Sequence, residues 1–350
     1  MSGDMDVNLV AQVEYLDGSP GGISRYCYEQ TRNIATCMPR NARVRVTSIR
    51  RRFPLGMLST KIAGLGFRQG PGILHNLTEM PLIPSRKDKG AMLVNTAHEF
   101  QRILYPEITR AEGRLPSEMP GYLVKKSYMW DILKGDCIIA SSTQTRSEAR
   151  TLGFDNEVFV VNPGVAGEFL SGPGRRRRKG AFRVGYIGAV RQRKGIETLV
   201  KSMDYLNDDF ELRIYGMIFD RFRDDFNRIM KGARNTRYCG VAPRSALVRL
   251  YDGLDAFVMP SLYEGFGISI LEAQARGIPV VVDSWGMLPR ETAMHCIKAD
   301  GAERIASVLW RLKEKGYSER SRRTAKAYAR SFTWKRTAEE TLRAYEKLTS

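Results

Sequence analysis

Short apolar runs alternate with amphipathic stretches along most of this 350-residue chain. The runs near residues 92–97, 158–162, 183–187, 210–215 and 256–260 have the length and composition of buried strands. Gly-containing loops and helical patterns follow several of them. Repeated strand–helix alternation is typical of α/β proteins with parallel sheets. The pattern therefore predicts the α/β class.

The clearest break in this alternation lies at residues 171–180, where turn-forming residues lead into a run of five basic residues. A fresh strand pattern follows the break. Because 350 residues suit two domains of ordinary size, we predict an N-terminal domain over 1–170, a linker over 171–180 and a second domain over 181–333. A solvated hinge and a contact with lipid or phosphate are both open interpretations of the basic run.

The most informative segment follows the strand at 256–260. The strand runs into a loop broken by glycines, and a helix opens near Ile268. Such a junction points free backbone N–H groups and the positive end of a helix dipole above the sheet, which suits a phosphate. Glu264 and Glu272 bracket it. Carboxylates beside a phosphate need hydroxyls and nearby bases, and a nucleotide sugar supplies hydroxyls on its ribose and its hexose.

The same segment carries a family resemblance. Glu264, seven further residues, Glu272, a helix of small residues and then Gly277-Ile-Pro-Val-Val281 resemble the donor-binding signature of retaining glycosyltransferases of family 4, the glycosyl transferases group 1. The resemblance covers roughly residues 14–350. It implies the GT-B fold, in which two Rossmann-like domains face a central cleft. It also implies that the amphipathic helix over 334–350 crosses back to the N-terminal domain.

The resemblance assigns roles to residues of the second domain. Glu264 would hold hydroxyls of the transferred sugar, and Glu272 would hold the nucleotide ribose. The loop after the strand at 183–187 resembles the one that grips the donor diphosphate with Arg and Lys. The donor-binding residues implied in this domain are Gly188, Arg193, Lys194, Glu264, Gly265, Phe266, Gly267, Ile268 and Glu272.

The first domain supplies further candidates by the same resemblance. Gly21 and Gly22, ahead of a helix predicted over Tyr28–Thr36, match a Gly-Gly loop beneath the donor diphosphate and sugar. His98 ends a strand pattern and inherits the position of a histidine that lies against the transferred sugar. We therefore take His98, Arg193, Lys194 and Glu264 as the catalytic set.

Two positions depart from the family pattern. Glu99 stands where an Asp is usual, and Ala189 stands where many relatives carry an Arg directly after the glycine. Arg191 or Arg193 would replace the missing charge; the alternative is weakened binding of the diphosphate.

The net charge of +18 is distributed unevenly. Residues 1–170 hold 21 Lys and Arg against 17 Asp and Glu, and residues 171–350 hold 35 against 21, giving +4 and +14. An anionic membrane surface, a lipid phosphate or nucleic acid would each fit such an excess. Residues 50–68 combine five bases, no acid and apolar residues at helical spacing, as in an interfacial membrane helix or an acceptor-lipid site; a helix packed on its own domain is the alternative. The candidate contacts are Arg50, Arg51, Arg52, Lys61 and Arg68.

Other sequence features favour a cytoplasmic enzyme, peripheral on the cytoplasmic face of a membrane. Five scattered cysteines form no C-x-x-C pair, as in proteins with reduced thiols. No apolar run approaches a membrane span, and the N-terminus lacks the pattern of a signal peptide. We predict no metal site and no cofactor: the only Asp-x-Asp, at Asp4 and Asp6, lies at the terminus.

The sequence thus predicts a retaining, metal-independent hexosyltransferase. It would move a hexose from a UDP- or GDP-sugar to a hydroxyl of a glycan or lipid acceptor. This acceptor would be lipid-linked or associated with a membrane. The first alternative is a soluble sugar or sugar-phosphate acceptor. The second is a basic nucleic-acid-binding protein on a degenerate GT-B scaffold, which no aromatic-rich or helix-turn-helix motif supports.

Overall fold

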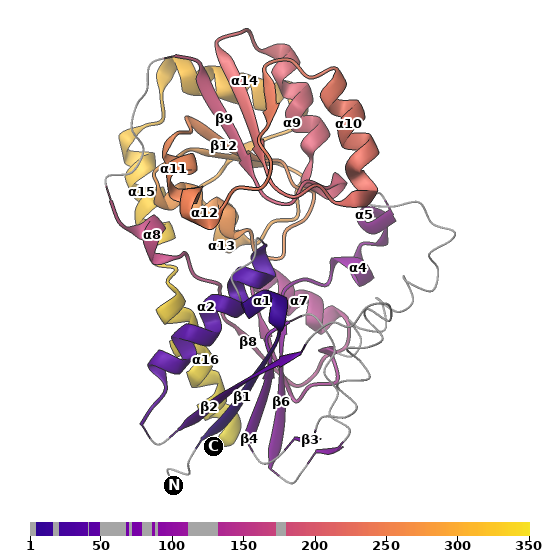
Figure 1. The fold of residues 1–350 in the computed structure, drawn as a ribbon, viewed down its shortest axis with the longest axis vertical. Coiled ribbons are helices and arrows are strands. Elements are labelled where there is room, and N and C mark those ends of the chain that lie inside the picture. Colours follow the sequence, from indigo (N-terminus) through magenta and orange to yellow (C-terminus); the bar gives the residue numbers. More distant parts are fainter. Residues whose placement is uncertain are drawn as a thin grey trace. The chain divides into compact units, whose positions relative to one another are not determined.

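The computed structural model describes residues 5–16, 21–40, 42–49, 68–69, 72–78, 86–87, 90–110, 132–172 and 180–350. Its contacts divide the chain into two compact units. The first unit holds the described residues of Met1–Tyr105, Leu115–Gly164 and Thr333–Ser350. The second holds those of Pro106–Arg114 and Val165–Phe332. Each unit is an α/β structure with its own parallel sheet (Figure 1).

The sheet of the first unit has the strand order β2-β1-β4-β6-β7-β8, and each neighbouring pair is parallel. Its strands are β1 (Asp6–Gln12), β2 (Arg43–Ile49), β4 (Gly72–Asn76), β6 (Ala91–Ala97), β7 (Cys137–Ala140) and β8 (Glu157–Val160), with β3 (Arg68–Gln69) and β5 (Arg86–Lys87) in a separate parallel pair. Its helices are α1 (Val13–Leu16), α2 (Gly22–Cys37), α4 (Gln101–Leu104), α7 (Thr143–Thr151) and α16 (Trp334–Thr349).

The sheet of the second unit has the order β11-β10-β9-β12-β13-β14 and is also parallel throughout. Its strands are β9 (Phe182–Ile187), β10 (Phe210–Tyr215), β11 (Thr236–Tyr238), β12 (Ala256–Met259), β13 (Val280–Asp283) and β14 (Ile297–Ala299). Its helices are α5 (Pro106–Arg110), α8 (Gly167–Leu170), α9 (Ile196–Ser202), α10 (Arg223–Lys231), α11 (Leu247–Asp252), α12 (Ile268–Ala275), α13 (Arg290–Ala293), α14 (Gly301–Lys315) and α15 (Glu319–Arg330), with 3-10 turns η1 (Gln192–Lys194), η2 (Met203–Tyr205), η3 (Asp220–Phe222) and η4 (Arg244–Ala246).

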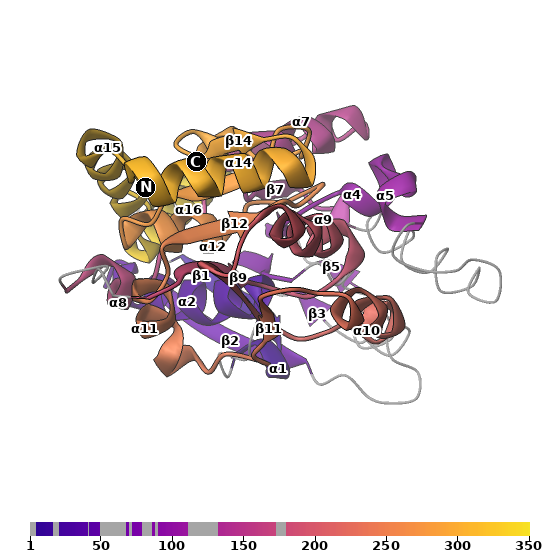
Figure 2. The same cartoon turned by 90° about the horizontal axis from the view of Figure 1, so that it is seen from above.

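Strand β9 shows how the second unit fills both faces of its sheet. Val184 and Tyr186 point into a core that also holds residues of α9 and α14, two helices that pack against each other (Figure 2). Gly185 lies between them in sequence and faces the other way. A side-chain carbon at this position would lie 2.3 Å from Leu254, just after α11. Because successive strand residues face opposite sides, apolar residues occupy both faces, as in a sheet covered by helices on each side.

The C-terminal helix belongs to the first unit, although the residues before it belong to the second. Helix α16 packs along α2 (Figure 1), and Thr341 of α16 accepts a 2.7 Å hydrogen bond from the Gln30 amide of α2. Thr337 adds a 2.9 Å bond to the carbonyl of Asn162. The predicted α/β class with two Rossmann-like domains and a returning C-terminal helix is thereby confirmed.

Two boundaries differ from the sequence-based expectations. Helix α2 begins at Gly22, earlier than the predicted Tyr28, since its mixed face buries Ser24 and Tyr26 as well. Residues 165–170 belong to the second unit, because Phe169 of α8 packs edge-on against Tyr251 with ring centroids 5.6 Å apart. Residues 173–179 of the predicted linker lie outside the described residues.

A buried histidine joins α16 to the sheet of the first unit. His75 of β4 is fully buried. Its Nδ1 lies 2.5 Å from the Tyr345 hydroxyl of α16, and its Nε2 lies 2.8 Å from Thr96 Oγ1 of β6. Burial, and to a smaller extent the nearby His98, lower the pKa of His75 from 6.5 to about 3. The imidazole therefore stays neutral in the folded protein throughout the physiological range.

This neutral histidine makes stability depend on pH. Between pH 6.5 and about 3 the unfolded chain binds a proton at His75 that the folded protein does not bind. The free energy of unfolding therefore falls as pH falls through that window, by up to about 1.4 kcal/mol per pH unit from this residue. Urea unfolding at pH 4–8 would measure it. His75→Gln should flatten the slope, whereas Tyr345→Phe, which retains the buried imidazole, should keep it; equal slopes in His75→Gln and the unaltered protein would contradict this.

Candidate functional site

The loop from β12 to α12 carries the acidic residue at the centre of the second unit's candidate site. Glu264 is 6% exposed. Gly265, Phe266 and Gly267 complete the loop, and α12 begins at Ile268 without a side-chain cap on its first N–H groups. The Thr292 hydroxyl donates a 2.7 Å hydrogen bond to the carbonyl of Phe266, which fixes the loop from below. The first turn of α12 therefore presents main-chain donors beside a buried carboxylate.

Lys194 forms an ion pair with this carboxylate. Its Nζ lies 2.5 Å from Oε1 and 2.6 Å from Oε2 of Glu264. Both residues are buried, at 8% and 6% exposure. A buried charge needs a partner, because removing it from water costs several kcal/mol. Each of the two residues therefore stabilises the charge of the other at the carboxyl edge of the sheet.

The loops that follow β9 and β12 are joined by their main chains. The Leu262 N–H donates a 2.8 Å bond to the carbonyl of Arg193, and the Arg193 guanidinium donates a 2.7 Å bond from Nη1 to the carbonyl of Tyr263. Gly195, with φ of +67°, lies so close to β12 that a side-chain carbon there would be 2.0 Å from the carbonyl oxygen of Pro260. Arg193 and Lys194 are therefore held against the Glu264 loop by a close backbone approach that only glycine permits.

The two arginines that follow Ala189 have different surroundings. Gly188 follows β9, and its N–H donates a 3.0 Å bond to the carbonyl of Tyr215. The Arg191 guanidinium lies 3.6 Å from the centre of the Phe219 ring, in cation–π geometry. Arg193 is buried and bonded to the Glu264 loop. Of the two, Arg193 is thus the one placed with Lys194 and Glu264.

Helix α12 is tied to α11 by two side-chain contacts one turn apart. Glu272 is 1% exposed, and its Oε2 accepts a 3.0 Å hydrogen bond from the Tyr251 hydroxyl. Arg276 pairs with Asp252 through two bonds of 2.7 and 2.8 Å. Arg276 also donates to the carbonyls of Phe169 and Ser171. Tyr251, Asp252 and Arg276 could not be recognised as site residues from the sequence, since contacts between residues more than 20 positions apart leave no local pattern.

The first unit places its own candidates at the carboxyl edge of its sheet. Gly21, with φ of +142°, precedes α2, whose first turn has no side-chain cap and no acid. Gly22 is the first residue of that helix. The backbone conformation of Gly21 is one that residues with a side chain rarely adopt, so the Gly-Gly pair leaves main-chain N–H groups at this helix start.

His98 follows β6 at the same edge. Its Nε2 lies 3.0 Å from the carbonyl oxygen of Leu77. Because a carbonyl only accepts, we assign the proton of the neutral ring to Nε2, which leaves Nδ1 as the acceptor nitrogen. Burial lowers the pKa of His98, while the Leu77 bond and the neighbouring Glu99 act in the opposite direction. A neutral His98 is therefore the form that the fold favours.

The side chains of the remaining candidates, in the basic segment 50–68, are not among the described parts of the structure. Arg50, Arg51, Arg52 and Lys61 are not among the described residues. Arg68 begins β3, and the position of its side chain is not described. Within the described residues no group of three or more His, Cys, Asp or Glu could hold a metal ion. None of the described helices is long and apolar enough to cross a membrane.

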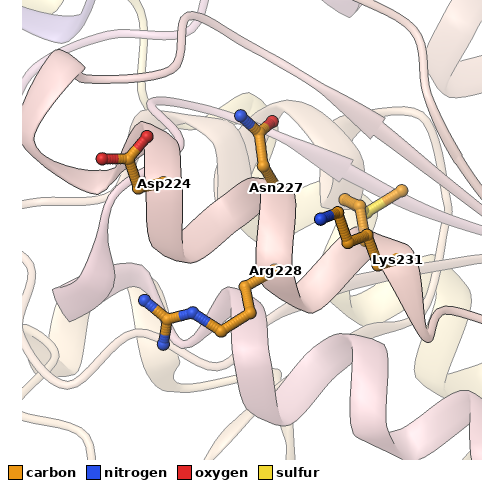
Figure 3. A pocket seen from close by; sticks show the side chains of 5 residues that line it. Asp224, Asn227, Arg228 and Lys231 are labelled. Carbon is orange, nitrogen blue, oxygen red and sulfur yellow. The ribbon is translucent and has the colours of Figure 1, made fainter.

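A separate hollow lies over α10. Its volume is about 660 Å³, and Asp224, Asn227, Arg228, Met230 and Lys231 line it. Figure 3 shows Asp224, Asn227, Arg228 and Lys231 projecting from this one helix. None of the candidate donor residues contributes to it, so it is distinct from the site around Lys194 and Glu264.

The two parallel sheets with flanking helices define a protein of the GT-B fold class. Solved structures support this over nearly the whole chain. WaaG, described as a glycosyltransferase involved in lipopolysaccharide biosynthesis, has a TM-score of 0.68 at 12% identity, covering 98% of this chain and 100% of that one. Sucrose-phosphate synthase from Thermosynechococcus elongatus has a TM-score of 0.67 at 16% identity, covering 98% and 99%. Anabaena HepE, solved in complex with UDP and glucose, has a TM-score of 0.65 at 15% identity, covering 98% and 100%.

The sequence match covers a smaller part of the chain than the structural match does. Residues 174–330 match the model of the glycosyl transferases group 1. O-antigen chain mannosyltransferase B of Escherichia coli is 33% identical over 173 residues, 47% of this chain and 45% of that protein. Glycogen synthase of Mycobacterium tuberculosis is 28% identical over 233 residues, 62% of this chain and 55% of that protein. This chain spans about half the length of these two curated relatives. The match to the group 1 glycosyl transferases thus lies within the second unit, and the likeness over the whole chain is one of fold.

The close approach of Gly195 to Pro260 can be tested by substitution. Gly195→Ala should lower the free energy of unfolding by at least about 2 kcal/mol, because the new carbon collides with Pro260 in a strained backbone conformation. Thermal or urea unfolding would measure it. Gly232→Ala, where the added carbon meets no atom within 4 Å, is the matched control. An equal loss of unfolding free energy in the two variants would contradict the close backbone contact between Gly195 and Pro260.

Proposed function

We propose that the protein transfers a hexose from a UDP- or GDP-sugar to an acceptor hydroxyl with retention of configuration. The observation that carries this proposal is the buried Lys194–Glu264 pair beside Arg193 and the start of α12. The relatives named above are a mannosyltransferase and a glycogen synthase, and HepE was solved with UDP and glucose. These names support a nucleotide-sugar donor.

The ion pair suits a donor that carries both a diphosphate and hydroxyls. Ionised Glu264 only accepts hydrogen bonds, and the Lys194 ammonium only donates them. A bound diphosphate would accept from Lys194, and hydroxyls of the sugar would donate to Glu264. Donor binding would then exchange one pairing for two, and neither buried charge would lose a partner. Glu272, about one turn into α12, would accept from the ribose.

The basic residues of the site suit the negative charge that would develop on the leaving group. When the bond between the anomeric carbon and the phosphate oxygen breaks, negative charge accumulates on the departing diphosphate. Arg193, Lys194 and the N–H groups at the start of α12 would stabilise it electrostatically, a role that fixed donors perform well in a dry site. On the first unit, Gly21 and Gly22 would offer main-chain donors and His98 would contact the sugar.

For retention without a covalent intermediate, the acceptor oxygen would attack from the face that the diphosphate leaves. In this step the acceptor oxygen forms a bond to the anomeric carbon, and its proton passes to the departing phosphate oxygen. The step needs no protein base. Metal-independent turnover is part of the proposal, because Arg193 and Lys194 supply the positive charge.

A thermal-shift panel tests the donor site. UDP, GDP, ADP and their glucose and mannose conjugates would be added in the presence of EDTA. We expect one nucleotide to raise the melting temperature, since a ligand at 100 times its Kd stabilises by about 2.7 kcal/mol. Lys194→Ala should weaken that nucleotide about 10- to 100-fold, the worth of a charged hydrogen bond. Glu264→Gln should lose only the increment contributed by the sugar.

The control for this panel is Lys201→Ala, which breaks the exposed Lys201–Glu197 pair on α9 and should leave the response unchanged. Near-normal sugar transfer by both Lys194→Ala and Glu264→Gln would show that the donor site is assigned wrongly. Binding of nucleic acid without a response to any nucleotide would favour the degenerate-scaffold alternative.

For the acceptor, we propose a lipid-linked or membrane-associated glycan, handled by an enzyme peripheral to the cytoplasmic membrane face. The charge of +18 and the basic segment 50–68 support this. The E. coli relative is named for the O-antigen chain, and WaaG for lipopolysaccharide biosynthesis. A soluble sugar or sugar phosphate is the alternative acceptor.

Vesicle co-sedimentation separates these acceptors. We expect binding to phosphatidylglycerol vesicles that weakens with salt, and a loss of about 100-fold when Arg50, Arg51 and Arg52 are all replaced by Ala, at about 1 kcal/mol per residue. The control replaces Arg221, Arg223 and Arg228 of η3 and α10, an equal change in net charge. Vesicle-independent transfer to soluble sugars, with equal losses in both triple variants, would favour the soluble acceptor.

A further inference from the structure

Three aromatic side chains form a continuous contact inside the first unit. The Tyr26 ring of α2 meets the His98 ring nearly edge-on, with centroids 4.7 Å apart and an interplanar angle of 83°. On its other side Tyr26 meets Trp334, the first residue of α16, at 5.8 Å and 69°. Tyr26 is 1% exposed and Trp334 is 4% exposed. Both rings are therefore fixed by packing, and His98 is packed against them.

His98 needs such a contact to keep one orientation. Its carbonyl oxygen accepts a 3.0 Å bond from the Ser141 hydroxyl, which holds the main chain. The bond from Nε2 to Leu77 holds one ring atom. The terminal torsion of a histidine is broad, so one hydrogen bond leaves the ring free to pivot about it. The edge of Tyr26 against the ring removes that freedom.

Trp334 stands where the chain passes from the second unit to the first. The division falls between residues 332 and 333, and also between 164 and 165. In the second unit, the Val165 N–H donates a 2.9 Å bond to the carbonyl of Phe332. In the first unit, a side-chain carbon on Gly164 would lie 2.3 Å from the Trp334 nitrogen. The crossings at 164–165 and 332–333 therefore run side by side, and Trp334 is the first helical residue after the second of them.

From these contacts we infer that Tyr26 and Trp334 are positioning residues for His98. Tyr26 sets the plane of the His98 ring, and Trp334 braces Tyr26 against the paired crossover. The orientation in which His98 meets the transferred sugar is thus set by two rings of the first unit, the second of which opens α16. This inference rests on the proposed function for the role of His98, but the positioning itself is a property of the first unit alone.

Long-range ¹H–¹⁵N spectra of the histidine rings test the positioning without any substrate. The unaltered protein and Tyr26→Phe, which keeps the ring, should show His98 as a single tautomer with the proton on Nε2. Tyr26→Leu and Trp334→Leu should give a mixture of tautomers. Ile34→Ala is the control, because it removes a fully buried side chain from the same helix about two turns further along; it should lower the melting temperature and leave the His98 signals unchanged.

The second measurement is the rate of turnover. The substrate is the nucleotide sugar that responds in the thermal-shift panel, and its hydrolysis is the reaction that is followed. Tyr26→Leu and Trp334→Leu should lower kcat about 10- to 100-fold through a misplaced ring. The Kd of UDP or GDP should stay within about twofold, because Lys194 lies in the other unit. Tyr26→Phe should retain activity.

Two outcomes would overturn the inference: an unchanged His98 tautomer in Tyr26→Leu, or an equal disturbance in Ile34→Ala. A wild-type protein that neither binds nor hydrolyses any nucleotide sugar would instead defeat the proposed function. The spectra would still decide whether Tyr26 positions His98.

Discussion

The buried pairing of Lys194 with Glu264 is the constraint on which the second unit's site depends. Two charges with little access to water are costly to bury unless each has a close partner. The partners come from loops after β9 and β12, which are neighbours because Val184 pairs with Ala256 and Gly185 with Phe257 in the parallel sheet. The sheet register therefore places the charges, and Gly195 closes the remaining gap by letting its backbone reach Pro260.

Helix α12 connects the Glu264 loop to the second carboxylate of the site, that of Glu272. The Glu264 loop leads directly into this helix, and the Tyr251–Glu272 and Asp252–Arg276 contacts fix the helix to α11. Arg276 also reaches the carbonyls of α8 and its following residue, so it anchors the stretch of chain that enters the unit. Several contacts therefore fix the orientation of α12, so the loss of any one of them would leave the others to hold the helix in place.

The sequence predicted the periodic parts of the fold and the local part of the site. The start of α12 at Ile268 follows from the glycines before it, and the strands at 183–187 and 210–215 follow from their apolar runs. The early start of α2 could not be read from its mixed face, because the burial of Ser24 and Tyr26 comes from tertiary packing. The pairing of Lys194 with Glu264 could not be predicted from the sequence either, because the two residues are 70 positions apart. Whether Arg191 or Arg193 joins them depends on the position of Phe219.

The protonation state of His98 indicates how the two units would divide the chemistry. Its Nε2 proton is committed to the Leu77 carbonyl, and burial lowers its pKa, so the ring offers an acceptor nitrogen and no mobile positive charge. Such a ring suits a sugar hydroxyl, which can donate to it, and does not suit a phosphate, which cannot. Under the proposed function, stabilisation of the leaving diphosphate must therefore come from the second unit, where Arg193 and Lys194 lie. The first unit would then orient the sugar, and the packed rings of Tyr26 and Trp334 would hold His98 in the orientation that this requires.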